Sequence, residues 1–218
     1  VQVLLDAIKV SEKKIRFLQV STDEVYGSIE SGSWTEDWPL QPNSPYSASK
    51  ASAELLVKSY IETYDCNANI TRCTNNFGPR QSPEKLIPKV IMLAQENKKI
   101  PIYGNGENIR DWLHVSDHVS ALILAGTSKK PFDKFAIGGN QEISNIDLTK
   151  VICNQLDVKK PKSLPYFEQG TYVTDRLGHD RRDAIDATYV SETMAFKPTY
   201  TLETGIVETI DWYLENQA

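Results

Sequence analysis

Apolar residues along the chain alternate between helical and extended spacing. Residues 1–8 repeat apolar side chains at helical intervals, and residues 15–20 form a short apolar run typical of a strand buried in a parallel sheet. We expect further helices over about 45–64, 84–97, 116–125, 146–156, 189–194 and 203–214, and further strands at 69–73, 100–103, 110–114 and 134–137. Loops or irregular structure are expected at 28–45, 75–83 and 157–187, where Gly, Pro, Ser and Asn interrupt the pattern.

This alternation of strands and helices is typical of an α/β fold. Parallel strands in such folds end at a common edge, where ligands bind. The strands of the second half are shorter and separated by longer irregular segments. The pattern therefore predicts a main parallel sheet with a smaller α/β lobe attached to its edge.

Composition narrows the class of protein. The chain has 218 residues, a formal net charge of −5 and 40% hydrophobic residues, which suffices for a buried core and argues against a nucleic-acid-coating protein. No apolar run is long enough for a membrane-spanning helix, and no signal peptide is visible. Cys66, Cys73 and Cys153 lack metal or disulfide spacing, so we expect a reducing, cytoplasmic location.

Tyr46 and Lys50 stand four residues apart in the helix expected over 45–64, so they share one helix face. A neighbouring ammonium favours the phenolate, so we expect Lys50 to lower the pKa of Tyr46 toward the range of a general base. The same lysine is able to hold a ribose hydroxyl of a cofactor. Taken alone, this spacing is more often an exposed helix pair without chemistry.

Thr22, Asp23 and Glu24 follow the first predicted strand directly. Two adjacent carboxyl groups are costly to bury unless one is protonated or they point in different directions. The pair therefore has the pattern of a general acid beside a general base. Its ordinary structural interpretation is a helix cap with two solvated acids.

These two motifs together resemble the extended short-chain dehydrogenase/reductase superfamily. STDEVYG at 21–27 followed by PNSPYSASKA at 42–51 is similar, within that superfamily, to the dTDP-glucose 4,6-dehydratases. The resemblance continues through TRCTNNFGPRQSPEKLIPKVI, PIYGNGENIRDWLHVSDH, FAIGGNQEISN and VTDRLGHDRRDAID. Asp23-Glu24 is its most specific part, because related epimerases generally carry other residues at those two positions.

The resemblance implies a role for each catalytic residue. Tyr46 would remove the proton of the sugar's 4-hydroxyl while hydride passes to NAD, with Lys50 supporting the phenolate and Thr22 bonded to the same oxygen. Glu24 would then remove the proton on carbon 5, and Asp23 would protonate the departing 6-hydroxyl. Hydride returns to carbon 6 and gives a 4-keto-6-deoxy sugar nucleotide, as in deoxysugar synthesis.

The resemblance also implies a pocket for dTDP-glucose beside an NAD site, and no metal. Tyr46, Lys50 and Asn76 would contact the cofactor. The implied substrate-binding residues are Thr22, Asn75, Lys85, Leu86, Pro101, Ile102, Tyr103, Arg110, Asn145, Asp175, Arg176, Leu177, Gly178 and His179. Any one of them alone is more often a solvated or structural residue, but the basic groups crowded into DRLGHDRR at 175–182 of an acidic chain favour an anion site. Thymine and uracil are not distinguished by residue spacing.

The resemblance also implies which part of the nucleotide sugar each residue contacts. Lys85 and Leu86 would open a helix whose N–H groups suit a pyrophosphate, and Arg110 would fork onto a phosphate. Residues 101–103 would frame the base. The helix over 45–64 would pair with its twin in a homodimer.

The chain departs from the family pattern in lacking a glycine-rich turn of the form G-x-G-x-x-G. We therefore expect on the order of 100 residues with the first βα units to precede Val1. The fold class expected is then the C-terminal part of an NAD-binding Rossmann-like doubly wound sheet plus a smaller nucleotide-sugar-binding lobe. Residues 1–80 would belong to the first, and residues 81–218 mainly to the second, with about 111–140 returning to the Rossmann core.

Two alternatives stay open. One is a related nucleotide-sugar epimerase or decarboxylase, against which Asp23-Glu24 argues. The other is a non-catalytic fragment that binds a nucleotide or a partner chain, which the missing glycine-rich turn supports. Because the first βα units are missing from this sequence, we expect the chain by itself to bind NAD weakly, to be inactive without its N-terminal part and to leave one sheet edge uncovered.

Overall fold

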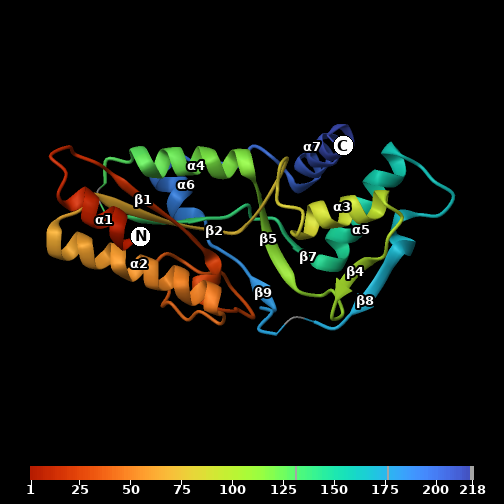
Figure 1. The fold of residues 1–218 in the computed structure, drawn as a ribbon, viewed down its shortest axis with the longest axis horizontal. Helices are drawn as coiled ribbons and strands as arrows, with labels where there is room; N and C mark the ends of the chain where they lie inside the picture. The colour runs from red at the N-terminus through yellow and green to blue at the C-terminus, as the bar shows by residue number, and fades with distance from the viewer. Residues whose placement is uncertain (131, 176, 217–218) are drawn as a thin grey trace.

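The structure, a computed structural model, describes residues 1–130, 132–175 and 177–216. One part of the molecule, which combines residues 1–73 with residues 115–137 and 188–194, is built around a parallel sheet with helices on both faces (Figure 1), as the sequence predicts. The elements of this part are α1 (Gln2–Lys9), β1 (Phe17–Thr22), the short 3-10 helix η1 (Asp23–Tyr26), α2 (Pro45–Tyr64), β2 (Ala68–Cys73), α4 (Val115–Thr127), β6 (Lys134–Ile137) and α6 (Thr188–Met194).

The three strands of this sheet lie in the order β1-β2-β6 and end at one level. Thr22 is in register with Cys73, and Cys73 with Ile137, so the three carboxyl ends form one edge. Every residue of the central strand β2 is buried. A parallel sheet needs cover on both faces, and α2 and α4 supply it from opposite sides (Figure 1). Among the described residues, β1 pairs with β2 alone and forms the sheet's outer edge.

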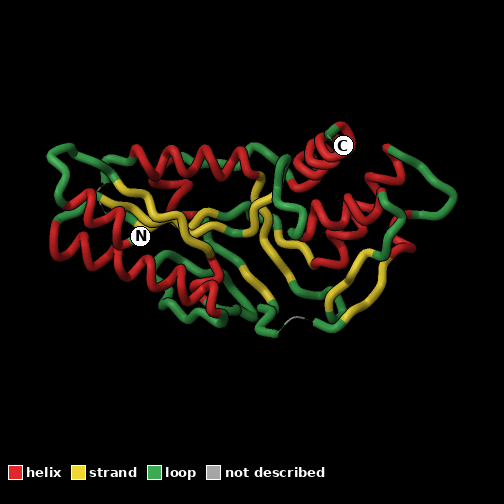
Figure 2. The backbone as a smooth tube through the Cα atoms, in the orientation of Figure 1, coloured by secondary structure: helices red, strands yellow, loops and turns green. Residues whose placement is uncertain are grey.

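The other part of the molecule contains shorter strands and three packed helices. Figure 2 shows these strands beyond the end of the first sheet. Its elements are β3 (Asn75–Phe77), α3 (Leu86–Gln95), β4 (Ile100–Tyr103), β5 (Ile109–His114), β7 (Glu142–Ser144), α5 (Asn145–Lys159), the 3-10 helix η2 (Tyr166–Gln169), β8 (Gly170–Val173), β9 (Arg182–Asp183) and α7 (Leu202–Glu215). Strand β5 pairs with β3, β7 and β9, and β4 pairs with β8.

Two sequence predictions about loops are wrong. Residues 75–83 begin with strand β3, and residues 157–187 contain η2, β8 and β9. These segments are two to four residues long, so their conformation depends on a distant partner: Asn76 lies opposite Leu113, and Asp183 lies opposite Arg110. Local periodicity carries no signal for such pairing.

The start of α2 agrees with the prediction, and it positions the catalytic candidates. Ser44 accepts a hydrogen bond from the Ser47 amide and Ser47 returns one to Ser44, with Pro45 in the first turn. This capping box satisfies N–H groups that the helix itself cannot. Tyr46 and Lys50 consequently follow a fixed helix start at the edge where the strands end.

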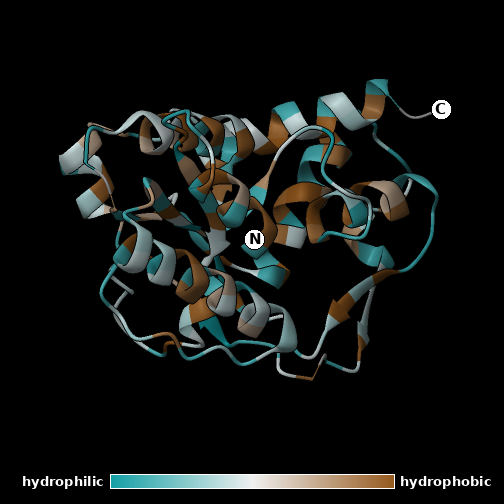
Figure 3. Cartoon of the chain, turned by 60° about the vertical axis from the view of Figure 1, so that its left-hand side comes forward, coloured by the Kyte–Doolittle hydropathy of each residue, from teal (hydrophilic) through white to brown (hydrophobic). Residues whose placement is uncertain are grey.

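Apolar side chains form three buried clusters. One lies between the sheet and α4, a second among α3, α5 and α7, and a third between α1, α2 and strands β1 and β2. Figure 3 shows apolar and polar residues on different sides of these helices. Trp34 and Trp112 are both buried. In the part of the chain that is described, no helix combines the length and apolar character needed to cross a membrane.

Candidate active site

The chain turns sharply where β1 ends, and Thr22 organises the turn. Its hydroxyl accepts a hydrogen bond from the Glu24 amide at 3.3 Å and donates to Asp23 Oδ1 at 3.2 Å. Thr22 is therefore the N-cap of η1, as the structural interpretation of the motif predicts. The cap sends the two neighbouring carboxyl groups into different environments.

Asp23 and Glu24 differ in burial. Asp23 is 3% exposed, and its Oδ2 has no hydrogen-bond partner among the described residues. Burial raises the pKa of Asp23 well above its ordinary value, and the nearby carboxyls of Asp183 and Glu24 raise it further. Glu24 is partly exposed and lines a pocket. The expectation that one carboxyl of the pair favours its protonated form agrees with these environments.

The expectation that Lys50 lowers the pKa of Tyr46 is wrong in this structure. Lys50 Nζ donates to the carbonyl oxygen of Val20 at 3.0 Å. The pKa of Tyr46 is raised, first by partial burial and then by the negative charge of Glu24. The Tyr46 side chain is nevertheless 54% exposed, so its phenol remains accessible at the edge of the sheet.

A pocket of about 450 Å³ opens beside this edge. Its wall is formed by residues from both parts of the molecule, including η1, α3 and β9. The sequence-predicted residues that line it are Glu24, Asn75, Asn76, Lys85, Leu86, Pro101, Tyr103, Arg110, Asn145, Leu177, Gly178 and His179. Residues spread over more than 150 positions of sequence thus meet at one cavity.

Six predicted site residues lie outside the pocket wall. Thr22, Asp23, Tyr46 and Lys50 lie at the adjacent strand edge. Ile102 is buried on the other side of β4, where it packs near Gly106 and Gly170. Asp175 forms an ion pair with His179 at 2.7 Å. A further predicted residue, Arg176, lies outside the described residues.

Charges in the pocket are distributed unevenly. Lys85 and Lys89 stand at the start of α3, beside Tyr103, whose hydroxyl lies 3.2 Å from Lys89 Nζ. Arg110 bonds to protein through all three guanidinium nitrogens, at the carbonyls of Ile109 and Asp180 and at a carboxyl of β9. One side of the pocket is therefore cationic, whereas the arginine predicted to contact phosphate is held by protein groups.

Sequence reasoning missed eight residues of the pocket wall: Ser44, Gln81, Glu84, Lys89, Val90, Trp112, Asp180 and Asp183. Most are flanked by predicted site residues and lack a motif of their own. Asp180 belongs to the charged run at 175–182 that the sequence predicts to be an anion site, and Asp183 follows that run directly. Pairing of β9 with β5 places Asp183 opposite Arg110 in the pocket wall.

Asn76 presents an unused hydrogen-bond acceptor. Its amide nitrogen donates to the Thr74 carbonyl at 3.2 Å and to Cys73 Sγ at 3.3 Å. The amide oxygen is buried and has no partner in the described part of the chain. An acceptor left in this state suits an external N–H donor, such as the carboxamide of a nicotinamide.

Comparison with known proteins identifies the family of the chain. The sequence model of the GDP-mannose 4,6 dehydratase family matches residues 1–209. The chain belongs to this family. A curated relative, the dTDP-glucose 4,6-dehydratase of Xanthomonas campestris pv. campestris (strain ATCC 33913), is 48% identical over 205 residues, which are 93% of this chain. The chain spans 58% of that relative's length.

Solved structures show the same family fold. The dTDP-glucose 4,6-dehydratase from Streptomyces venezuelae with NAD and TYD bound is 39% identical, with a TM-score of 0.93 over 99% of this chain and 64% of that one. UDP-glucuronic acid 4-epimerase from Bacillus cereus, in complex with UDP-glucuronic acid and NAD, is 28% identical with a TM-score of 0.87, covering 98% of this chain and 66% of that one. Family members that differ in reaction thus share this fold.

Proposed function

We propose that the chain carries the catalytic and substrate-binding residues of an NAD-dependent dTDP-glucose 4,6-dehydratase, which forms dTDP-4-keto-6-deoxyglucose and water. The observation that carries the proposal is the unequal pair at the end of β1. Asp23 is buried with a raised pKa, and Glu24 reaches the pocket. Elimination of water needs one group that gives a proton and one that takes a proton on the same substrate.

The two carboxyls divide the elimination step between them. Glu24, partly exposed in the pocket wall, removes the proton on carbon 5 of the hexose. Asp23, which keeps its proton to higher pH, donates that proton to the departing 6-hydroxyl, so one water leaves. Thr22 holds Asp23 through its hydroxyl and fixes the turn that separates the two groups.

Tyr46 would act on the 4-hydroxyl as the first proton acceptor. Its exposed side chain at the edge of the sheet is accessible to a sugar. Because its pKa is raised in this structure, Tyr46 would have to be brought to the phenolate form by a cation placed beside it before it accepts the hydroxyl proton. Lys50 is anchored on the Val20 carbonyl close to the same edge. The proton taken from the hydroxyl would therefore reside on Tyr46.

The residues present fit the nicotinamide end of NAD. Tyr46 and Lys50 offer a phenol and an ammonium on one helix face, and Asn76 offers a buried amide oxygen that has no partner among the described residues. When bound, the cofactor would accept a hydride from carbon 4 and return it to carbon 6.

The cationic side of the pocket suits the diphosphate. Lys85 is the N-cap of α3, where free backbone N–H groups point outward, and Lys89 lies one turn later. Pro101 and Tyr103 alternate along β4 on its pocket face and suit a flat base. The hexose would then lie at the opposite end, toward Glu24.

The test is conversion of dTDP-glucose with added NAD, followed by mass spectrometry in heavy water. We expect a product that is lighter by one water and carries solvent deuterium at carbon 5. Glu24→Gln should abolish both signals, because the amide takes up no proton at neutral pH. Glu84→Gln is the matched control, since Glu84 also lines the pocket but is open to solvent.

Two outcomes would contradict the proposal. Accumulation of the 4-epimer without loss of water would indicate an epimerase. Binding of dTDP-glucose without conversion by protein that calorimetry shows to be saturated with NAD would indicate a non-catalytic nucleotide-binding chain.

We also propose a homodimer through α2 and a division of the chain near residue 80. Leu55 and Leu56 are exposed on α2 beside the catalytic face. Exposed apolar side chains on one helix favour association with a second copy. Light scattering should give a dimer that Leu55→Glu dissociates, whereas Leu164→Glu, at an exposed leucine before η2, should leave the dimer intact. A monomeric parent protein would contradict the dimer.

A further inference from the structure

Asp183 is an acidic residue of the pocket wall to which the proposed mechanism assigns no role. It lies on β9, which pairs in parallel with β5 and places Asp183 opposite Arg110. Its Oδ2 accepts from Arg110 Nε at 2.8 Å. The guanidinium is itself held by the carbonyls of Ile109 and Asp180, so the carboxyl of Asp183 is fixed in place.

The other oxygen of this carboxyl is unused. Asp183 is 2% exposed, and its Oδ1 is buried with no hydrogen-bond partner among the described residues. The same is true of Asp23 Oδ2. A buried carboxyl oxygen without a donor is unfavourable, so two of them next to one cavity indicate donors that are supplied by a ligand.

The position of Asp183 identifies the part of the ligand. Its electrostatic neighbours are Glu24 and Asp23, the two groups proposed to act on the hexose. A carboxylate repels phosphate, and the cationic side of the pocket belongs to Lys85 and Lys89. Asp183 thus faces the sugar end, where hydroxyl groups are the available donors.

We propose that Asp183 is a hexose-binding residue, which is held through Oδ2 by Arg110 and accepts a hydrogen bond from a sugar hydroxyl at Oδ1. This inference rests on the proposed function. It makes Arg110 a positioning residue for Asp183 as well as a neighbour of the diphosphate.

The charge environment of Asp183 supports a role as acceptor. Burial, Asp180 and Glu24 raise its pKa to about 7, against the opposing effects of Arg110 and Arg182. A sugar hydroxyl bonded to Oδ1 would favour the ionised form and offset part of the burial. The bound hexose would therefore lower the pKa of Asp183.

The experiment compares two ligands by calorimetry, dTDP and dTDP-glucose, which differ by the hexose. In Asp183→Ala the ratio of the dissociation constant for dTDP-glucose to that for dTDP should rise about tenfold, since one hydrogen bond to a charged acceptor is lost. Using the ratio cancels any effect of the released Arg110 on the diphosphate. Asp183→Asn, which keeps one acceptor oxygen, should restore part of the loss.

Asp180→Ala is the matched control. Asp180 lines the same pocket, but its carboxyl already accepts from Asn43 Nδ2 at 2.9 Å, so the ratio should not change. An unchanged ratio in a folded Asp183→Ala protein, or in Asp183→Leu, which also has no acceptor, if the alanine variant fails to fold, would overturn this inference alone. Binding of neither ligand by the parent protein would overturn the proposed function, and this inference with it.

Discussion

Buried charges behind the pocket and at the pocket are treated in opposite ways. Between β2 and α2, Arg72 and Glu54 are 5% and 2% exposed and form a forked ion pair, with two guanidinium nitrogens bonded to the carboxylate. At the pocket, Asp23 and Asp183 are equally buried, yet each has one carboxyl oxygen without a partner among the described residues. The first arrangement stabilises one geometry, and the second leaves bonding capacity for a ligand.

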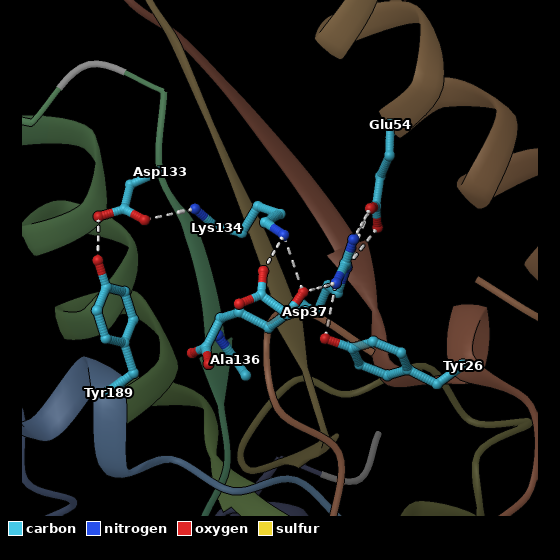
Figure 4. A network of polar contacts seen from close by, with 9 residues as sticks. Tyr26, Asp37, Glu54, Asp133, Lys134, Ala136 and Tyr189 are labelled. Atoms are coloured by element: carbon cyan, nitrogen blue, oxygen red, sulfur yellow. Dashed lines mark hydrogen bonds and ion pairs between the residues drawn. The ribbon is translucent and has the colours of Figure 1, made fainter. Parts of the chain in front are cut away.

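The first arrangement joins several elements that carry the site. Arg72 on β2 reaches Glu54 on α2, and its remaining nitrogen bonds to the Tyr26 hydroxyl of η1 and to the Glu36 carbonyl. Figure 4 shows this network, which continues through Lys134 to Asp37. Helix α2 carries Tyr46, and η1 carries Asp23 and Glu24, the proposed acid–base pair. Arg72 therefore links the two elements that carry the proposed catalytic residues.

In the second arrangement, the missing hydrogen bonds and the burial disfavour the charged forms of the two carboxyls, which their pKa values reflect. Asp23 and Asp183 both have raised pKa values, because burial disfavours their charged forms and each is near other carboxyls. Perturbed titration of this kind is concentrated at functional sites. The comparison teaches that unmet hydrogen-bonding capacity distinguishes the two carboxyls proposed to act on the ligand from the structural ion pair.

Breaking the paired charge should have the largest effect. Glu54→Gln leaves the Arg72 guanidinium buried without its counter-charge, so we expect the free energy of unfolding to fall by about 3–5 kcal/mol. Urea titration followed by circular dichroism measures this loss.

The same substitution at an exposed pair is the control. Glu96 pairs with Lys98, and both side chains are largely open to solvent, so Glu96→Gln should cost less than about 1 kcal/mol. A similar cost for both variants would show that the buried pair contributes no more than a surface pair.

Removing a pocket carboxyl should change the pH dependence of stability. The pKa of Asp183 rises from 3.8 to about 7 on folding, so between these values the folded chain binds the extra proton and stability falls as pH rises. In Asp183→Asn this part of the slope, up to about 1.4 kcal/mol per pH unit, should disappear between about pH 5 and 7. Urea titrations at three pH values measure it.

Asp37→Asn provides a control of opposite sign. A hydrogen bond from Lys134 lowers the pKa of Asp37, so its stabilising effect is present above about pH 4 and lost in acid. Its slope over the range used for Asp183 should match that of the parent protein. Equal slopes in the parent and in Asp183→Asn would contradict a raised pKa for Asp183.

The comparison also explains what the sequence could predict. The sheet and its covering helices follow from local periodicity, and the start of α2 from the Ser44-Pro45 signal. Motifs and the family resemblance brought Glu24, Asn75 and Lys85 to the pocket correctly. These predictions succeed because each depends on residues that are close in sequence.

The failures depend on distant contacts. Strand β8 pairs with β4, and β9 pairs with β5. Because both depend on these distant partners, the local sequence pattern does not predict them. The pKa of Tyr46 follows from where Lys50 points, and Lys50 points to Val20. Asp183 lies at the pocket because β9 pairs with β5, whereas the sequence predicts that residues 157–187 are irregular.

Removing one acceptor from the paired network should have a smaller effect. Tyr26→Phe removes the hydroxyl that accepts from Arg72 at 2.7 Å, while Glu54 and the Glu36 carbonyl remain, so we expect a loss of about 1.5 kcal/mol. Urea titration of the single variants and of the double variant with Glu54→Gln gives the coupling energy. Strict additivity would contradict a shared network.

The smallest effect should come from the helix cap that borders the pocket. Ser44→Ala removes the capping box of α2 and should cost about 1 kcal/mol. Thr201→Ala, at the capping box of α7, should cost about the same, because the two caps have the same hydrogen bonds. Thermal unfolding of both variants measures these costs.

Ligand affinity should separate the two caps. Ser44 is one of the described residues that line the pocket, and Thr201 is not. We therefore expect Ser44→Ala to weaken dTDP-glucose binding in calorimetry severalfold, and Thr201→Ala to leave it unchanged. If both variants bind equally well, the start of α2 acts on stability alone, and the orientation of Tyr46 does not depend on this cap.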